Sequence, residues 1–216
     1  MAPPGRLITI EGLDGAGKTT LAAGLEQELR RRRLPVVALR EPGGVVLGER
    51  IRALLADPVL DVDPRAEALL FAASRAQLVA ERLAPLLRDG AWVLLDRFVD
   101  SSLAYQGGGR ELGVDAVAAI NATAVGDVRP DRTLLLRLDP ATGRRRLAAR
   151  GDEADRMERL DEPFFARTAA AYDRIAEADP GRVRVLDATA EPDAVLAAAL
   201  AALADLLGPE GDSSGT

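Results

Sequence analysis

Residues 11–20 read EGLDGAGKTT, and this stretch decides which fold class the rest of the chain must fit. Positions 12–19 match the pattern G-x-x-x-x-G-K-[ST] in full, after a run typical of a strand and at the start of a helical pattern. The amide groups of such a glycine-rich loop, together with the amino end of the following helix, attract phosphate. We therefore predict a nucleoside triphosphate site formed by Gly12, Leu13, Asp14, Gly15, Ala16, Gly17, Lys18, Thr19 and Thr20. Lys18 is expected to reach the β- and γ-phosphates, and the Thr19 hydroxyl is expected to hold Mg²⁺.

Lys18 is the only lysine among the 28 basic residues of the chain. A compact ammonium on a flexible stem fits a tight loop in which the planar guanidinium of arginine does not fit. The lone lysine also narrows the protein class. GTP switches need an Asn-Lys-x-Asp segment, and partitioning ATPases carry a further lysine where this chain has Gly12. The pattern favours a small kinase, with biased codon usage as the plain alternative for the lysine and a turn that binds nothing as the alternative for the loop.

Composition bounds the remaining possibilities. A chain of 216 residues with 48% hydrophobic residues predicts one domain, so residues 1–216 are expected to form a single phosphate-loop kinase domain with tails at 1–5 and 208–216 that are not ordered. The absence of cysteine and histidine excludes thiolate metal sites and Ser-His-Asp chemistry. A net charge of −6 argues against a nucleic-acid partner. The longest apolar run, 195–207, is too short for a membrane span, and the expected location is cytoplasmic.

Strand and helix patterns alternate along the chain. The predicted strands are 6–12, 35–42, 91–97, 132–139 and 182–188, and the predicted helices are 18–33, 47–56, 65–88, 114–124, 141–150, 161–178 and 191–207. Such alternation predicts an α/β protein with a P-loop NTPase-type parallel sheet of about five strands and helices on both faces. Ligands of these folds bind beyond the carboxyl ends of the strands.

Charged residues stand at two of these strand ends. Arg40, in REPGG, is suited to grip an acceptor phosphate, although an arginine paired at a strand end is an equal alternative. Asp96 follows a buried strand and is expected to serve Mg²⁺, with Arg97 beside it to neutralise phosphate charge. Asp139, after the fourth strand, is the second candidate for the magnesium carboxylate.

Two further segments suit a nucleoside. Phe71 and Arg75 lie four residues apart and share a helix face, as base stacking and a hydrogen bond to the base would require, although core packing and a surface ion pair are the alternative. In the segment 100–110, DSSLAYQGGGR, hydroxyl and amide groups can bind a sugar and a base edge, and the glycines allow close approach of the backbone.

Taken in order, the segments GLDGAGKT, REPGG, LLFAASRAQ, LLDRF, AYQGGGR and LDAT resemble those of bacterial thymidylate kinases over about residues 6–190. The resemblance implies that Phe71 stacks on thymine, that Arg75 contacts the base edge, and that Ser102 and Gln106 lie near the base. It further implies that Tyr105 lies at the 2′ position, that Arg40 and Arg97 hold the acceptor phosphate, and that Asp14 lies near the sugar 3′-hydroxyl. Glu41 is expected to bind the substrate, and Asp187 and Ala188 are expected to line adenine.

The resemblance also implies a lid that carries the catalytic arginine. Position 16 is Ala16 and the phosphate loop holds no arginine, whereas six arginines fall at 144–159, within an expected lid of 141–162. Arg150 and Arg156 are the expected catalytic arginines of the lid, with a solvated basic helix end as the alternative. The other expected catalytic residues are Asp14, Lys18 and Arg97. The chain departs from the family at Phe98, where tyrosine or histidine is usual, and in a lid that is one residue longer.

The resemblance implies transfer of the γ-phosphate of ATP to dTMP, with Mg²⁺, by a homodimer, for which the apolar helix 65–88 is a candidate contact. A kinase for another nucleoside monophosphate or for a deoxynucleoside remains an alternative, and a nucleotide-dependent switch protein is a further one. The acceptor is already an anionic oxygen, so positioning and charge neutralisation should suffice without a strong base.

Overall fold

The computed structural model describes residues 5–149, 151 and 155–208. Five strands form one parallel sheet in the order β2-β3-β1-β4-β5. The strands are β1 (Arg6–Gly12), β2 (Val36–Arg40), β3 (Trp92–Asp96), β4 (Arg132–Arg137) and β5 (Val183–Asp187). The expected fold class is confirmed, and each strand falls within one predicted run.

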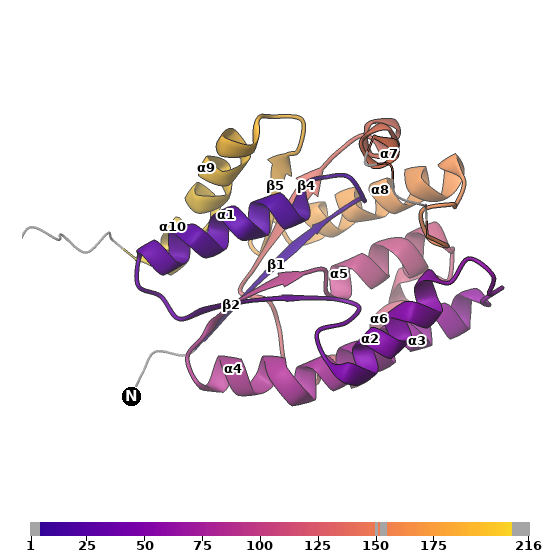
Figure 1. The fold of residues 1–216 in the computed structure, drawn as a ribbon, viewed down its shortest axis with the longest axis horizontal. Coiled ribbons are helices and arrows are strands. Elements are labelled where there is room, and N and C mark those ends of the chain that lie inside the picture. The colour runs from indigo at the N-terminus through magenta and orange to yellow at the C-terminus, as the bar shows by residue number, and fades with distance from the viewer. Residues whose placement is uncertain (1–4, 150, 152–154, 209–216) are drawn as a thin grey trace, which may run out of the picture.

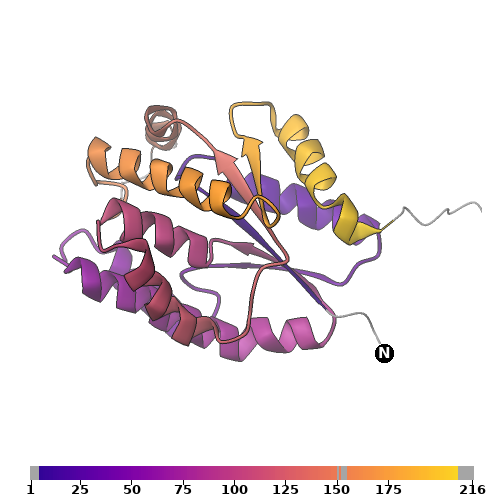
Figure 2. The same cartoon turned by 180° about the vertical axis from the view of Figure 1, so that it is seen from behind.

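Helices connect these strands and cover both faces of the sheet (Figures 1 and 2). The helices before β4 are α1 (Lys18–Arg31), α2 (Val46–Ala56), α3 (Pro64–Leu78), η1 (Val79–Leu83), α4 (Ala84–Arg88), α5 (Val99–Ser102), η2 (Leu103–Gly109) and α6 (Val114–Val125). Those after β4 are α7 (Pro140–Ala148), α8 (Glu162–Ala178), α9 (Pro192–Ala202) and α10 (Ala204–Leu207). Asp63, Asp139 and Asp161 cap α3, α7 and α8 with their side chains, which explains where these helices begin.

The segment 99–109 differs from expectation, because no helix was predicted there. Three consecutive glycines disfavour a helix, but η2 packs closely against α8, which supplies the compensation. A Cβ atom on Gly108 would lie 2.5 Å from the Cβ of Ala171, and one on Gly109 would lie 2.5 Å from Oγ1 of Thr168. Glycine is therefore required by the approach of two helices.

Alternation along the strands divides the core between the two faces. In β1, Ile8 and Ile10 pack in a cluster with Leu25 of α1 and Ala199 of α9. Leu7 points to the other face, where it packs in a second cluster with residues of α3, η1 and β3. A third cluster joins α8 and η2 to β4.

Parallel register brings the functional strand ends together at one edge of the sheet. Arg40 of β2 lies opposite Asp96 of β3, and Asp96 lies opposite Ile10 of β1, directly before the phosphate loop. Figure 1 shows α7 beyond this edge of the sheet. Residues far apart in sequence can therefore meet one ligand there.

Candidate functional site

A cavity of about 410 Å³ opens at this edge of the sheet. Residues of the phosphate loop line it together with residues of α3, β3, α5 and η2, so both halves of the predicted site border one space. The predicted residues among them are Asp14, Gly15, Gly17, Lys18, Thr19, Arg40, Glu41, Phe71, Asp96, Arg97, Ser102, Tyr105 and Gln106.

The phosphate loop has the curled backbone that its glycines predict. Gly15 has a φ of +79°, and a Cβ atom at this position would lie 2.5 Å from the carbonyl oxygen of Gly143 in α7. Lys18 folds back over the loop, where its Nζ donates to the carbonyls of Gly12 (3.2 Å) and Leu13 (2.9 Å). Burial, aided by the nearby charge of Arg97, lowers the pKa of Lys18 to about 8. The amine is thus held inside the loop, at the position from which it can turn to a phosphate.

Asp14, Arg97 and Tyr105 form a compact cluster beside the loop. Arg97 donates to Asp14 Oδ1 (2.5 Å) and to the Gly12 carbonyl (3.0 Å), while the Tyr105 hydroxyl donates to Asp14 Oδ2 (3.0 Å). Burial alone would raise the pKa of Asp14, but the charges of Arg97 and Lys18 lower it to about 2. Asp14 is therefore ionised, and it joins the phosphate loop to Arg97, which the resemblance assigns to the acceptor phosphate.

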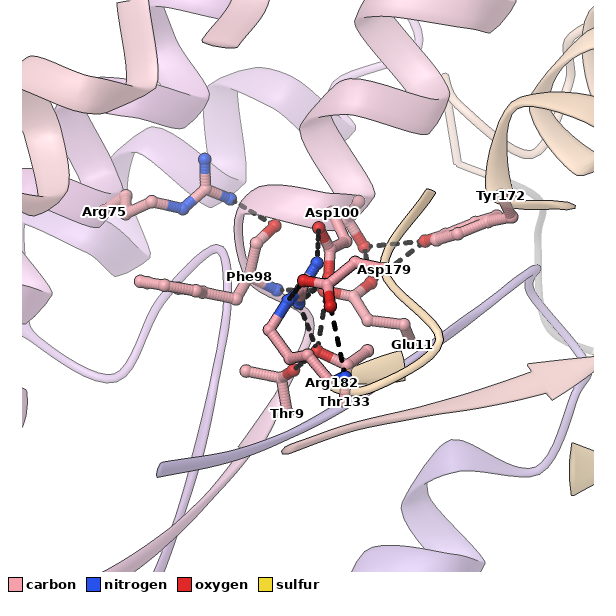
Figure 3. A network of polar contacts seen from close by, with 10 residues as sticks. Thr9, Glu11, Arg75, Phe98, Asp100, Thr133, Tyr172, Asp179 and Arg182 are labelled. Atoms are coloured by element: carbon pink, nitrogen blue, oxygen red, sulfur yellow. Dashed lines mark hydrogen bonds and ion pairs between the residues drawn. The ribbon is translucent and has the colours of Figure 1, made fainter. Parts of the chain in front are cut away.

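Glu11 fixes the turn that carries Arg97. Arg97 has a φ of +70°, a conformation that is strained for a residue with a side chain. The fully buried carboxylate of Glu11 accepts from the backbone N–H of Phe98 (2.7 Å) and from the hydroxyls of Ser101 (2.5 Å) and Tyr172 (3.0 Å) (Figure 3). Ser101 in turn accepts from Arg97 at 3.2 Å. Glu11 thus positions Arg97 indirectly, through the backbone of the next residue, Phe98, and through the hydroxyl of Ser101.

A second network anchors α5, the helix that carries Ser101. Asp100 of α5 accepts from Arg182 Nη1 at 2.6 Å, and Arg182 also donates to Thr133 and Asp179 (Figure 3). Thr133 contacts Thr9 through their hydroxyls at 2.7 Å. The start of α5 is therefore joined to β1, β4 and the turn before β5.

Arg75 is buried behind the cavity. It is 1% exposed and donates to Glu41 Oε2 (2.7 Å), Ser102 Oγ (3.0 Å), the Phe98 carbonyl (2.9 Å) and Asn121. Arg75 therefore reaches the cavity wall through Ser102, whereas Phe71, one helical turn earlier, lines the cavity.

Glu41 and Arg40 stand at the same strand end in different environments. Burial raises the pKa of Glu41 to about 7 despite the charge of Arg75, and its Oε1 has no partner among the described residues. Arg40 is half exposed and pairs with Glu49 at 3.0 Å. Arg40 also lines the cavity, so its guanidinium could pair with a phosphate there in place of Glu49.

Two arginines of the expected lid, Arg146 and Arg156, have different partners. Arg146 donates to the carbonyls of Ala188 (2.9 Å) and Gly15 (3.4 Å), so it joins the adenine loop of the prediction to the phosphate loop. Arg156 is held by Glu67 of α3 (2.8 Å) and by the carbonyl of Leu55 (2.9 Å).

Sequence reasoning favoured Arg150 and Arg156 over Arg146. The structure instead joins Arg146 to the phosphate loop, while the contacts of Arg156 lie on α2 and α3. Arg150 lies outside the described residues.

The residues expected to serve Mg²⁺ fit such a role. Asp96 has a buried Oδ1 without a hydrogen-bond partner among the described residues, and Thr19 is exposed at the mouth of the loop. Across the described ranges no group of three or more His, Cys, Asp or Glu side chains gathers to hold a metal. One or two protein oxygens are the usual number for an ion that is held mainly by substrate phosphates and water.

Comparisons with known proteins agree with this geometry. The family model described as thymidylate kinase matches residues 10–199. A thymidylate kinase of Deinococcus radiodurans is 47% identical over 93% of the chain and 97% of its own length, and one of Halorhodospira halophila is 46% identical over 96% and 97%. The crystal structure of thymidylate kinase from Ehrlichia chaffeensis has a TM-score of 0.76 at 31% identity, covering 93% of this chain and 99% of that one.

The chain belongs to the thymidylate kinase family. The resemblance drawn from its motifs is confirmed, and so is the expected enzyme class, a kinase. Among the described residues, none of the helices combines the length and the apolar character that crossing a membrane requires.

Several residues that shape this thymidylate kinase site escaped the sequence reasoning. Glu11 carries a signal in hindsight, because it is a carboxylate in an otherwise apolar strand position. Glu67 carries another, because it lies four residues before Phe71 and eight before Arg75 on one face of α3. Arg52 lines the cavity from α2, and no pattern in the sequence distinguishes it from other surface arginines.

Proposed function

We propose that this chain transfers the γ-phosphate of ATP to dTMP, producing dTDP and ADP. The single observation that carries the proposal is the shared cavity. The phosphate loop lines one part of it, and residues expected to bind the acceptor nucleotide line another, namely Phe71, Ser102, Tyr105 and Gln106. Family membership, with relatives named thymidylate kinase over nearly the whole chain, supports dTMP as the acceptor.

The residues of the cavity would have separate roles in phosphate transfer. Lys18 would leave its loop carbonyls for the transferred phosphate, and Arg97, held by Asp14 and Glu11, would neutralise the charge between donor and acceptor. Arg40 would grip the acceptor phosphate in place of Glu49. Asp14 would orient the sugar 3′-hydroxyl, and Tyr105 would fill the 2′ position.

Base recognition falls to the wall opposite the loop. Phe71 would stack on thymine, while Ser102 and Gln106 would contact its edge with Arg75 supporting Ser102 from behind. Adenine of ATP would lie near Asp187 and Ala188, close to Arg146. Mg²⁺ would be held by Thr19 and Asp96, and its chemistry is to draw charge from the phosphate oxygens.

We propose Arg150 as the catalytic lid arginine in preference to Arg156. The guanidinium of Arg156 is committed to the buried carboxylate of Glu67, so its replacement should affect acceptor binding. Replacing Arg150 with methionine should instead lower kcat with little change in either KM. Equal KM effects of the two substitutions would contradict this division.

A coupled assay of ATP consumption with dTMP, dUMP, dGMP and thymidine tests the activity. We expect dTMP to be the preferred acceptor by kcat/KM. Preference for another monophosphate or for thymidine would favour the alternative kinases, and slow ATP hydrolysis that no acceptor stimulates would favour a switch protein.

We also propose that the enzyme acts as a cytoplasmic homodimer. ATP, its donor, is kept at working concentration in the cytoplasm. Leu47 and Leu54 of α2, two turns apart, are 46% and 49% exposed, and Leu69 of α3 is 57% exposed. These packed helices offer an apolar contact for a second copy. Light scattering should show a dimer that Leu54→Asp and Leu69→Asp together convert to a monomer, and a wild-type monomer would contradict the proposal.

A further inference from the structure

Glu67 of α3 is a buried carboxylate that joins two arginines to the acceptor side of the cavity. It is 0% exposed. Arg110 donates to both of its oxygens, with Nε 3.1 Å from Oε1 and Nη2 2.7 Å from Oε2. Arg156 Nη2 lies 2.8 Å from Oε2. Among the described residues Gln106 also contacts this carboxylate, and its Nε2 donates to Oε1 at 3.0 Å.

This set of partners fixes the charge of Glu67. Burial by itself raises the pKa of the carboxyl, but hydrogen bonds from Arg110 and Gln106 and the charge of Arg110 outweigh it, and the pKa is lowered. An ionised carboxylate has only acceptor atoms. A side-chain amide against it must therefore present its nitrogen, whichever way the two amide atoms would otherwise be assigned.

The orientation of the Gln106 amide follows from this. Because one hydrogen of Nε2 is donated to Glu67, the amide oxygen lies on the other branch of the amide, and it is the acceptor that Gln106 can offer to the cavity it lines with Phe71 and Ser102. Oε1 of Gln106 has no protein partner among the described residues. The cavity is therefore offered a hydrogen-bond acceptor, the Gln106 amide oxygen, because Glu67, which does not line the cavity, binds the amide nitrogen.

We propose that Glu67 is a positioning residue that selects the acceptor base by fixing the Gln106 amide with its oxygen toward the cavity. Thymine and uracil carry a hydrogen on N3, which this oxygen accepts. Cytosine carries an unprotonated N3, which would face the oxygen with no hydrogen between them. The inference rests on the proposed function, since it requires a pyrimidine beside Phe71.

The substitution Glu67→Gln turns this arrangement around. Oε2 has two arginine contacts, from Arg110 and Arg156, whereas Oε1 has one, from Arg110 Nε. The single oxygen of the new amide is therefore favoured at the Oε2 position, and its NH₂ group takes the place of Oε1 with loss of the Arg110 Nε hydrogen bond. Gln106 must then turn its oxygen to this NH₂ group, and its own NH₂ group faces the cavity. A donor now meets N3, which suits cytosine and opposes thymine.

The size of the change follows from leaving one buried polar group unpaired. Such a mismatch costs about 1–3 kcal/mol, which corresponds to a factor of about 5 to 150. We expect the ratio of kcat/KM for dTMP to that for dCMP to fall at least about tenfold in E67Q. Loss of stability alone would lower both values in proportion and leave the ratio unchanged.

The experiment measures kcat/KM with dTMP and dCMP for the wild type, E67Q and the exchanged pair E67Q/Q106E. In the exchanged pair, the NH₂ group of residue 67 meets a carboxylate that again presents oxygen to the cavity, so the dTMP preference should return. Glu28→Gln is the matched control, because Glu28 also binds two arginines, Arg31 and Arg32, but on the surface helix α1. Its ratio should equal that of the wild type.

Gln106→Met keeps Glu67 intact and covers the case in which E67Q does not fold. It should bring the dTMP and dCMP values toward each other. A wild-type ratio in Q106M, an unchanged ratio in folded E67Q, or a failure of E67Q/Q106E to regain dTMP preference would each overturn the proposal. A wild-type protein that does not phosphorylate dTMP would instead refute the proposed function. Failure of the Glu67 proposal and failure of the proposed function are therefore distinguishable.

Discussion

Replacing Lys18 with methionine should stabilise the nucleotide-free protein while it abolishes most of the activity. The amine is buried, with 7% of the residue exposed, and its only hydrogen-bond partners among the described residues are two carbonyl oxygens. Each carbonyl has another donor, since Gly12 also accepts from Arg97 (3.0 Å) and Leu13 from the amide of Ala16 (3.2 Å). Removal of the amine therefore leaves neither oxygen unsatisfied.

The magnitude follows from the pKa of Lys18. Its lowering from the ordinary value of 10.5 to about 8 means that the folded state disfavours the charged amine by about 3 kcal/mol. This penalty is fully present below pH 8 and fades as the pH rises toward 10.5. Methionine retains the aliphatic stem, so at pH 7 we expect the free energy of unfolding to rise by about 1–3 kcal/mol and Tm by about 2–4 °C per kcal/mol.

Urea and thermal unfolding of the metal-free protein, in a buffer without phosphate or sulfate, provide the assay. Arg174→Met on the exposed face of α8 is the control for loss of one positive charge. Turnover of Lys18→Met should fall by at least about a hundredfold, because transition-state charge loses its partner. A variant of Lys18 that is less stable than the wild type at pH 7, or whose advantage persists at pH 10.5, would refute the reasoning.

Three further predictions concern other parts of the site. Phe71→Ala should raise the KM for dTMP by about 5- to 150-fold and leave that for ATP nearly unchanged, because base stacking is worth about 1–3 kcal/mol; a parallel rise would disprove base stacking. Arg146→Met should raise the KM for ATP by about tenfold without changing that for dTMP, because it removes the hydrogen bonds by which Arg146 joins the carbonyls of Ala188 and Gly15. Steady-state kinetics with each substrate checks this. Glu41 has a raised pKa of about 7, so the wild type should lose stability as pH rises from 4.5 to 7 relative to Glu41→Gln; parallel unfolding curves would contradict this.

The phosphate loop and the sheet were predictable because their signals are local. The loop is one unbroken segment whose glycines and lysine act through their own backbone and immediate neighbours. Buried strands of a parallel sheet appear as apolar runs, and parallel connections then place their carboxyl ends at one edge. The segment 99–109 was missed because its helix depends on the fit of its glycines against α8, which no local pattern records.

The sequence by itself determined the fold class, the phosphate loop and the family, since these rest on contiguous motifs and on hydrophobic periodicity. Only the tertiary structure decided which charged groups meet. Glu11 contacts Tyr172, which lies 161 residues later in the sequence, and Arg146 contacts Gly15, which lies 131 residues earlier. Arg156 pairs with Glu67. Side-chain partners of this kind depend on the order of the strands and on the helices packed above them. The spacing of residues along the chain does not encode that arrangement.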